Sequence, residues 1–140
     1  METLKTLVWT DKLTMYNAKL DYQHQTLFKY INEIIEVELI TPRSKQFAEI
    51  LSKITDYGLE HFKEEERLML DLGFPQDLLQ DHVQQHRDYI YQVAMFNTRF
   101  YLPNSSNPAD VISFLRDWWY KHILRSDMRF SQYLRKQLSS

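Results

Sequence analysis

The sequence predicts an all-α protein, an up-down-up-down four-helix bundle with an N-terminal arm and a short C-terminal helix. The 140-residue chain contains only two glycines and four prolines but 44% hydrophobic residues, a composition typical of helices rather than turn-rich sheets. Four long segments carry apolar residues at steps of three and four, the period of an amphipathic helix. Because short connections separate them, we expect antiparallel neighbours within a single domain, residues 1–140.

The chain begins with an arm and the first bundle helix. Residues 1–16 show no sustained helical period, and we expect an ordered arm whose Trp9 packs over the bundle. The first bundle helix is predicted over residues 17–39. His24 falls within its apolar stripe, which comprises Leu20, Leu27, Ile31, Ile34 and Ile35.

The second bundle helix is predicted over residues 42–72. Thr41 would be its N-cap and Pro42 its first residue, where the missing N–H of proline costs nothing. Gly58 lies on the inward face and costs about 1 kcal/mol relative to alanine in a helix interior, so we expect a neighbouring helix to approach closely there. Residues 73–75, with the sequence Gly-Phe-Pro, then end the helix.

The third and fourth helices are separated by the most loop-like stretch of the chain. The third is predicted over residues 76–100. A Pro-Asn-Ser-Ser-Asn sequence at residues 103–107 follows, and Asn107 would cap a fourth helix that begins at Pro108 and spans 108–123.

The end of the fourth helix contains an irregular spacing. His122 and Asp127 are five residues apart, about 140° around an ideal helix, so both cannot point inward along an unbroken one. We therefore predict a break or bulge between Ile123 and Ser126. A short terminal helix over residues 126–138 would follow and pack back on the bundle.

Composition excludes several classes of function. The chain has no cysteine, which rules out disulfides, thiol nucleophiles, iron–sulfur clusters and thiolate zinc sites. A formal net charge of -2 and a pI near 6.2 provide no basic field, so we expect no nucleic-acid partner. The apolar group at residues 7–9 is too short for a signal peptide or a membrane span, so we expect a cytoplasmic monomer without membrane insertion.

All five histidines and two carboxylates fall on the expected inward faces. His61 and Glu65 are four residues apart, a spacing that puts both on one helix face about 6 Å apart along the axis. A lone histidine on such a face is more often a hydrogen-bonded core residue, and a lone His/Glu pair can be a solvated ion pair. Seven buried ionisable groups together need a partner, and coordination of a metal is the usual one. These residues are His24, His61, Glu65, His82, His86, His122 and Asp127.

The size of this set favours two metal ions. Five imidazoles and two carboxylates exceed the four ligands of a structural zinc site. Nitrogen and oxygen ligands without sulfur suit iron or manganese, and a histidine-rich set favours iron. If both carboxylates bridge, seven side chains form nine bonds, and a shared hydroxide or oxide fills eleven of twelve octahedral positions. One position would stay open.

The spacing H24…H61-x3-E65…H82-x3-H86…H122-x4-D127 resembles the hemerythrin family, and specifically its free-standing bacterial members. The stretches around these residues are also similar to that family, from Trp9 through residues 21–27, 61–69 and 118–123 to about residue 130. The resemblance implies two non-heme iron ions, cycling between Fe²⁺ and Fe³⁺, with a bridging oxo or hydroxo group. It implies that Glu65 and Asp127 bridge the two ions, and that one iron is held by His24 and His61 and the other by His82, His86 and His122.

The resemblance further implies that dioxygen binds reversibly to the two-histidine iron without a protein acid or base. Reversible binding requires a pocket that admits an apolar gas but discourages water and anions. Residues placed to line it are Leu27, Phe62, Trp118, Trp119 and Ile123, although ordinary core packing is the alternative for Leu27 and Ile123. The family often has leucine at the position of Trp119, whose larger ring would narrow access or donate its N–H to the bound ligand.

We therefore expect an oxygen-binding protein, a carrier, store or local supply, rather than an enzyme. Dioxygen is the expected partner, and the sequence identifies no protein partner. The alternatives are a diiron redox enzyme acting on peroxide or nitric oxide, and an oxygen or redox sensor acting through a partner. Glu64 and Glu66, which flank Glu65, are expected to face solvent.

Overall fold

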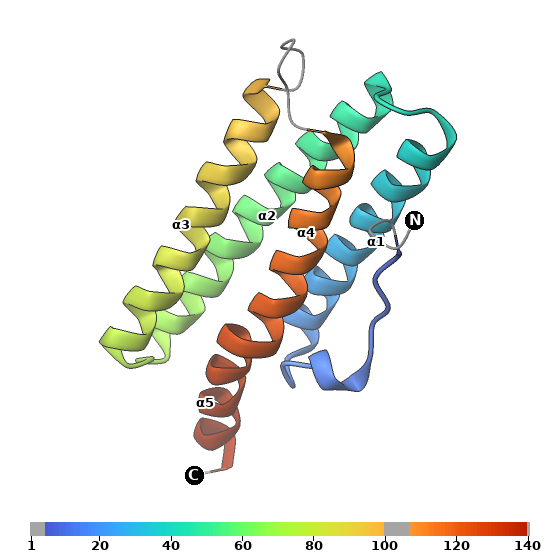
Figure 1. The fold of residues 1–140 in the computed structure, drawn as a ribbon. Helices are drawn as coiled ribbons and strands as arrows, with labels where there is room; N and C mark the ends of the chain where they lie inside the picture. The colour runs from blue at the N-terminus through green and yellow to red at the C-terminus, as the bar shows by residue number, and fades with distance from the viewer. Residues whose placement is uncertain (1–4, 100–106, 140) are drawn as a thin grey trace.

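The structure is a computed structural model, and it describes residues 5–99 and 107–139. Four antiparallel helices run up, down, up and down, which confirms the predicted fold class (Figure 1). They are α1 (Ala18–Ile40), α2 (Lys45–Asp71), α3 (Gln76–Arg99) and α4 (Pro108–His122). A π-helical segment, η3 (Ile123–Asp127), joins α4 to the terminal helix α5 (Met128–Ser139). Of the helices described, none is both long and apolar enough to span a bilayer.

The predicted start of the second helix at Pro42 is wrong. Thr41 is the C-cap of α1, with extended backbone angles, because a residue that precedes proline disfavours the helical region. Arg43 has a left-handed φ of 55°, which turns the chain and prevents a helix from starting there. Ser44 caps α2 instead, and its hydroxyl accepts a hydrogen bond from the Phe47 N–H at 3.1 Å.

The predicted bulge after His122 is present as η3. In a π-helix the hydrogen bonds span five residues instead of four, so His122 and Asp127 can lie on the same side of the helix axis. The expected cap of α4 is also present, because the Asn107 Oδ1 accepts a hydrogen bond from the Ala109 N–H at 2.9 Å. Residues 100–106, which include most of the predicted loop, lie outside the described part of the chain.

Two apolar clusters fill the bundle. In the orientation of Figure 1, the larger cluster spans the upper parts of α1, α2, α3 and α4, and the smaller cluster joins the lower ends of the helices to α5. On α1, for example, His24 lies between Leu20 of the smaller cluster and Leu27 of the larger. The inward histidines and carboxylates therefore form a polar layer between two hydrophobic ones.

The N-terminal arm crosses the outside of the bundle, as expected for the described residues 5–16. The Trp9 ring packs edge-on against Phe28 of α1, with centroids 5.6 Å apart. The Leu7 N–H donates to the Asn32 Oδ1 at 2.7 Å, and the Asn32 amide donates back to the Leu7 carbonyl at 3.0 Å. These contacts hold the arm against α1.

Candidate metal centre

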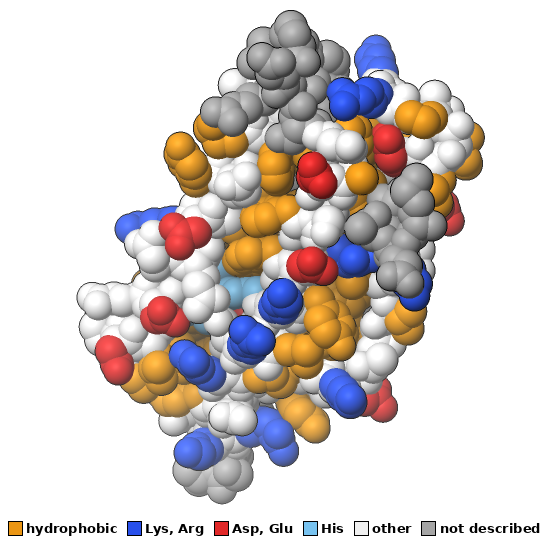
Figure 2. All heavy atoms as spheres, in the orientation of Figure 1, with side chains coloured by type: hydrophobic (Ala, Val, Ile, Leu, Met, Phe, Trp, Pro, Cys, Tyr) orange, Lys and Arg blue, Asp and Glu red, His pale blue; other side chains and the backbone are white. Residues whose placement is uncertain are grey.

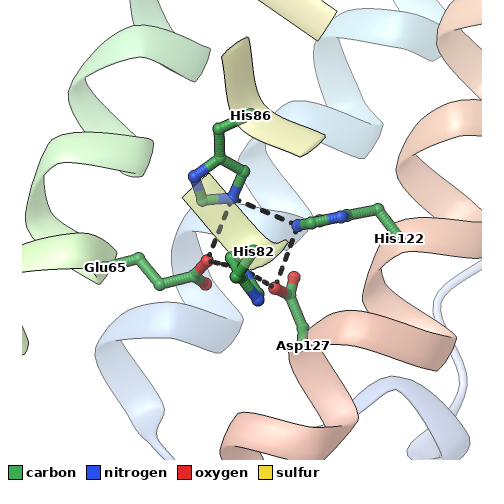
Figure 3. A group of neighbouring side chains, drawn as sticks. All are labelled: Glu65, His82, His86, His122 and Asp127. Carbon is green, nitrogen blue, oxygen red and sulfur yellow. Dashed lines mark hydrogen bonds and ion pairs between the residues drawn. The ribbon is translucent and has the colours of Figure 1, made fainter. Parts of the chain in front are cut away.

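The structure brings all seven predicted ligand residues together, and none is more than 4% exposed. They form two groups, within each of which the ligand atoms all lie within 4.8 Å of one another. One group comprises His82, His86 and His122 with both carboxylates, and the other comprises His24 and His61 with the same two carboxylates. Figure 3 shows the first group, with residues from α2, α3, α4 and η3 pointing toward one point.

Each carboxylate presents one oxygen to each group. The Glu65 Oε1 lies 2.7 Å from the His82 Nε2, whereas its Oε2 lies 3.5 Å from the His61 Nε2. The Asp127 Oδ1 lies 3.2 Å from the His122 Nε2, and its Oδ2 lies 3.1 Å from the His24 Nε2. This is the arrangement that two bridging carboxylates require.

The histidines converge through their Nε2 atoms. The Nε2 atoms of His24 and His61 are 3.0 Å apart, and those of His86 and His122 are 3.2 Å apart. Two ring nitrogens at that distance can share only one proton, so one would donate and the other accept. A cation between them would use both lone pairs.

Three of the histidines are held from behind by a hydrogen bond from Nδ1. A neutral imidazole that donates from Nδ1 keeps the lone pair on Nε2, the form that binds a metal. The acceptors are the Gln23 Oε1 for His61 at 2.6 Å, the Glu66 Oε2 for His86 at 2.7 Å and the Gln85 Oε1 for His122 at 2.9 Å. The Ser126 hydroxyl donates to the same Gln85 oxygen at 2.6 Å, which fixes that amide.

The expectation that Glu64 and Glu66 face solvent is confirmed for Glu64 and wrong for Glu66. Glu66 is half-buried, and its carboxylate accepts a hydrogen bond from the His86 Nδ1. Glu64 is exposed, but its carboxylate accepts a hydrogen bond from the Gln23 amide and pairs with Lys19 at 3.4 Å. Both residues support the ligands from outside the cluster.

The three acceptors share one position relative to the cluster, and they were not predicted from the sequence. Gln23, Glu66 and Gln85 each lie next to an inward ligand in the sequence, about 100° around the helix, and each bonds a histidine on the following helix. On α1 and α3 the acceptor comes just before the neighbouring cluster residue in the sequence. On α2, which runs antiparallel to both, the acceptor comes just after it. After His122, the last residue of α4, the matching residue is Ile123 of η3, whose side chain has no acceptor, and the His24 Nδ1 has no hydrogen-bond partner. In the sequence, the available signal was a polar residue next to an inward residue of the cluster on α1, α2 and α3.

The carboxylates remain ionised in this setting. Burial would raise the pKa of Glu65, but hydrogen bonds from surrounding histidines outweigh it and hold that pKa well below its ordinary value. The pKa of Asp127 is also lowered, chiefly by electrostatic attraction to His122, against the opposing effect of burial. For His82, burial is outweighed by its contacts with both carboxylates, which raise its pKa to about 10. Burial lowers the pKa of His61 and of His122.

A cation would satisfy atoms that the protein leaves without partners. The Glu65 Oε2 and both oxygens of Asp127 are buried and accept no hydrogen bond. A buried ionised carboxylate is costly unless it is paired or coordinates a metal. Because the donor set is imidazole and carboxylate without sulfur, it fits a six-coordinate transition metal such as iron.

Four of the five predicted pocket residues are buried in the core. Leu27, Phe62, Trp119 and Ile123 are at most 2% exposed. The Trp119 ring centroid lies 5.9 Å from that of His61 and 6.5 Å from that of His24, and Phe62 stacks on Trp119 at 5.3 Å. Trp118 differs because it is partly exposed and stacks on His122, with centroids 4.4 Å apart.

The predicted close approach at Gly58 involves a side chain rather than a helix backbone. A Cβ at Gly58 would lie 3.4 Å from the Cζ2 of Trp119 and 3.8 Å from the Cε2 of Tyr89. The Trp119 indole N–H donates to the Tyr89 hydroxyl at 2.9 Å, so it is not directed at the cluster. Trp119 therefore acts as an apolar wall rather than as a donor to a bound ligand.

Comparison with known proteins agrees with this geometry. Residues 16–134 match the family model described as the hemerythrin HHE cation binding domain. A bacteriohemerythrin of Stenotrophomonas maltophilia is 26% identical over 133 residues, 95% of this chain and 84% of that protein. A myohemerythrin of Riftia pachyptila is 26% identical over 125 residues, 88% of this chain and 89% of that protein. A crystal structure of a hemerythrin mutant superposes with a TM-score of 0.81 at 24% identity, covering 90% of this chain and 95% of that chain.

Proposed function

Because this chain belongs to the hemerythrin family, we propose that its ligand cluster holds two non-heme iron ions and binds dioxygen reversibly. The observation that carries the proposal is the unequal division of the ligands. Five residues surround one metal position and four surround the other, with both carboxylates shared.

The division leaves one coordination position open. With one oxo or hydroxo group between the ions, the position beside His82, His86 and His122 has six ligands, which completes an octahedron. The position beside His24 and His61 has five. A small ligand would therefore bind on the two-histidine side. An iron pair in this site supplies the two electrons that dioxygen takes up on binding and returns on release.

The protein's contribution is to keep that side dry and free of proton donors. Reversibility requires that water, protons and anions stay away, because they promote loss of the reduced oxygen species. The wall formed by Leu27, Phe62, Trp119 and Ile123 is apolar and buried. Trp119, the one member with a polar hydrogen, gives it to Tyr89, whose pKa is raised by burial so that its hydroxyl stays protonated. We accordingly propose a carrier, store or supply protein rather than an enzyme.

The test is an oxygen cycle on the iron-loaded protein. The protein is reduced anaerobically, air is admitted, and the visible spectrum is followed as oxygen is added and then removed under vacuum. We expect a charge-transfer band that appears with oxygen and disappears without it, and about two iron ions per chain by metal analysis. Rapid irreversible oxidation without such a band would favour the redox-enzyme or sensor alternatives. About one zinc per chain would overturn the two-iron assignment.

A further inference from the structure

An open cleft lies on the three-histidine side of the centre, between α3 and the continuous α4, η3 and α5. Its volume is about 540 Å³, within the range of small-molecule sites. Phe114 and Trp118 supply an aromatic wall, and Gln85, His122 and Ser126 supply a polar floor. Figure 2 shows Lys and Arg side chains gathered beside this hollow, with a histidine visible next to them.

The rim of the cleft is cationic. Lys121, Arg125 and Arg129 line it at four-residue spacing, and all three side chains are exposed. Asp117 is the acidic residue on the rim, and it pairs with Arg116 at 3.7 Å. Arg129 reaches the exposed Asp81 at 3.8 Å. Within the described ranges no carboxylate pairs with Lys121 or Arg125, so these two charges are free to bind an anion.

The cleft communicates directly with the metal centre. The Trp118 ring, in the wall, stacks on the His122 ring with centroids 4.4 Å apart and planes 13° apart. The His122 Nε2 lies 3.2 Å from the Asp127 Oδ1 inside the cluster. A molecule in the cleft is thus separated from the ligand atoms by one or two stacked rings. The Trp119 ring lies against the other two histidines, so a gas entering beside Trp119 and a ligand in the cleft would approach from different sides.

We propose that this cleft binds a small aromatic anion that donates electrons, of the type of a reduced flavin phosphate, and that it re-reduces the centre after oxidation. The ring system would lie against Phe114 and Trp118, and the phosphate would lie between Lys121 and Arg125. The redox role rests on the proposed function. In that step a reduced flavin loses two electrons and two protons. The electrons pass through Trp118 and His122 to two ferric ions, which become ferrous, and the protons go to solvent.

Binding is tested first, with the oxidised iron-loaded protein and without oxygen cycling. Flavin mononucleotide and riboflavin share the ring but differ in the phosphate, and their fluorescence is followed during titration with protein. We expect riboflavin to bind about tenfold more weakly, because it lacks the charge-assisted contacts. Lys121→Gln with Arg125→Gln should weaken flavin mononucleotide about tenfold and leave riboflavin unchanged. The control is Lys63→Gln with Arg67→Gln, an exposed pair of the same types and spacing on α2.

Electron delivery is tested by mixing the oxidised protein anaerobically with each reduced flavin. The Lys121/Arg125 double variant should be reduced more slowly by the phosphorylated flavin only, and Trp118→Leu should slow reduction even at saturating flavin. Equal binding of the two flavins to the unmodified protein, no saturable binding, or unchanged binding in the double variant would each overturn the assignment. Because flavin binding is measured without oxygen, its failure and a failure of reversible oxygen binding are separate results.

Discussion

Trp119 lies beside His24 and His61 with a fully buried ring, whereas Trp118 lies on His122 and lines an open cleft. On the two-histidine side the wall residues are at most 2% exposed, and the His24 Nδ1 has no hydrogen-bond partner. On the three-histidine side Glu66 and Gln85 fix the rings. Both sides share the same two carboxylates. The difference indicates that solvent is excluded from the two-histidine side and reaches the edge of the three-histidine side at His122.

The largest effect should come from removing a carboxylate that serves both sides. Glu65→Ala deletes an oxygen from each group of ligands and leaves the histidines with an unfilled buried space, so iron content should fall from about two ions per chain to fewer than one. Iron is measured by metal analysis after reconstitution. Glu60→Ala, on an exposed turn of the same helix, should leave the iron content unchanged. Equal losses in the two variants would show that Glu65 is not a ligand.

Removing an acceptor should affect only the three-histidine side. Glu66→Ala deprives the His86 Nδ1 of its partner, and loss of such a partner typically lowers metal affinity by about 10- to 100-fold. In a time course of iron release to a chelator, one of the two ions should leave faster and the other should not. Glu66→Gln keeps an acceptor oxygen and should lie between the two. Faster release of both ions would contradict the separation of the two sides.

Metal binding to the metal-free protein should displace a proton from His82. The pKa of His82 is raised to about 10, so at neutral pH a metal must displace that proton to bind. Apparent Co²⁺ affinity should therefore rise at least about tenfold per pH unit between about pH 6 and pH 8, because the pKa of His86 is also raised by its hydrogen bonds to Glu65 and Glu66. The released protons are detected with an indicator dye. An affinity independent of pH would show that His82 is already neutral.

The raised pKa of His82 should also make the metal-free protein less stable as the pH rises. A group whose pKa is higher in the folded state stabilises it fully below the unfolded value, 6.5 for histidine, and loses that contribution as pH rises toward about 10. The metal-free protein should therefore become less stable across that window, as measured by urea unfolding. The metal-loaded protein should not, since its His82 has already lost the proton.

Residue type and spacing were sufficient to predict which seven residues come together, because a histidine on an apolar stripe stands out within a single helix. His122 and Asp127 even predicted the irregularity between them, which the π-helical segment provides. The supporting residues were not predictable in this way. Gln23 and Glu66 act on a histidine of the next helix, and such contacts depend on how helices are aligned along the bundle. The shift of the α2 cap to Ser44 follows from a left-handed residue that local propensity did not indicate.

On the two-histidine side, replacing Trp119 should have a smaller effect than removing a shared carboxylate or an acceptor. Trp119→Leu shortens the buried ring and leaves the Tyr89 hydroxyl without its donor, so water should reach the site and autoxidation should be several-fold faster. The cavity should also lower the unfolding free energy by about 2–4 kcal/mol. Tyr89→Phe removes the hydrogen bond but keeps the wall, and should change the autoxidation rate much less. An unchanged rate in Trp119→Leu would rule out a gating role for the ring.

The smallest effect should come from Gly58→Ala, which probes how tightly that wall is built. The added methyl would lie 3.4 Å from the Trp119 ring, at the short end of ordinary van der Waals contact, so tight packing there should offset part of the gain in stability. Alanine gains roughly 1 kcal/mol over glycine in a helix, and the melting temperature should rise by less than that gain alone would give. In a Trp119→Leu background the obstacle is gone, and the same substitution should stabilise by nearly the full amount. A double-mutant cycle of thermal unfolding therefore measures the contact itself. If Gly58→Ala stabilises equally in both backgrounds, the glycine does not serve to make room for the tryptophan. The packing around Trp119 would then be looser than the dry pocket proposed for reversible oxygen binding requires.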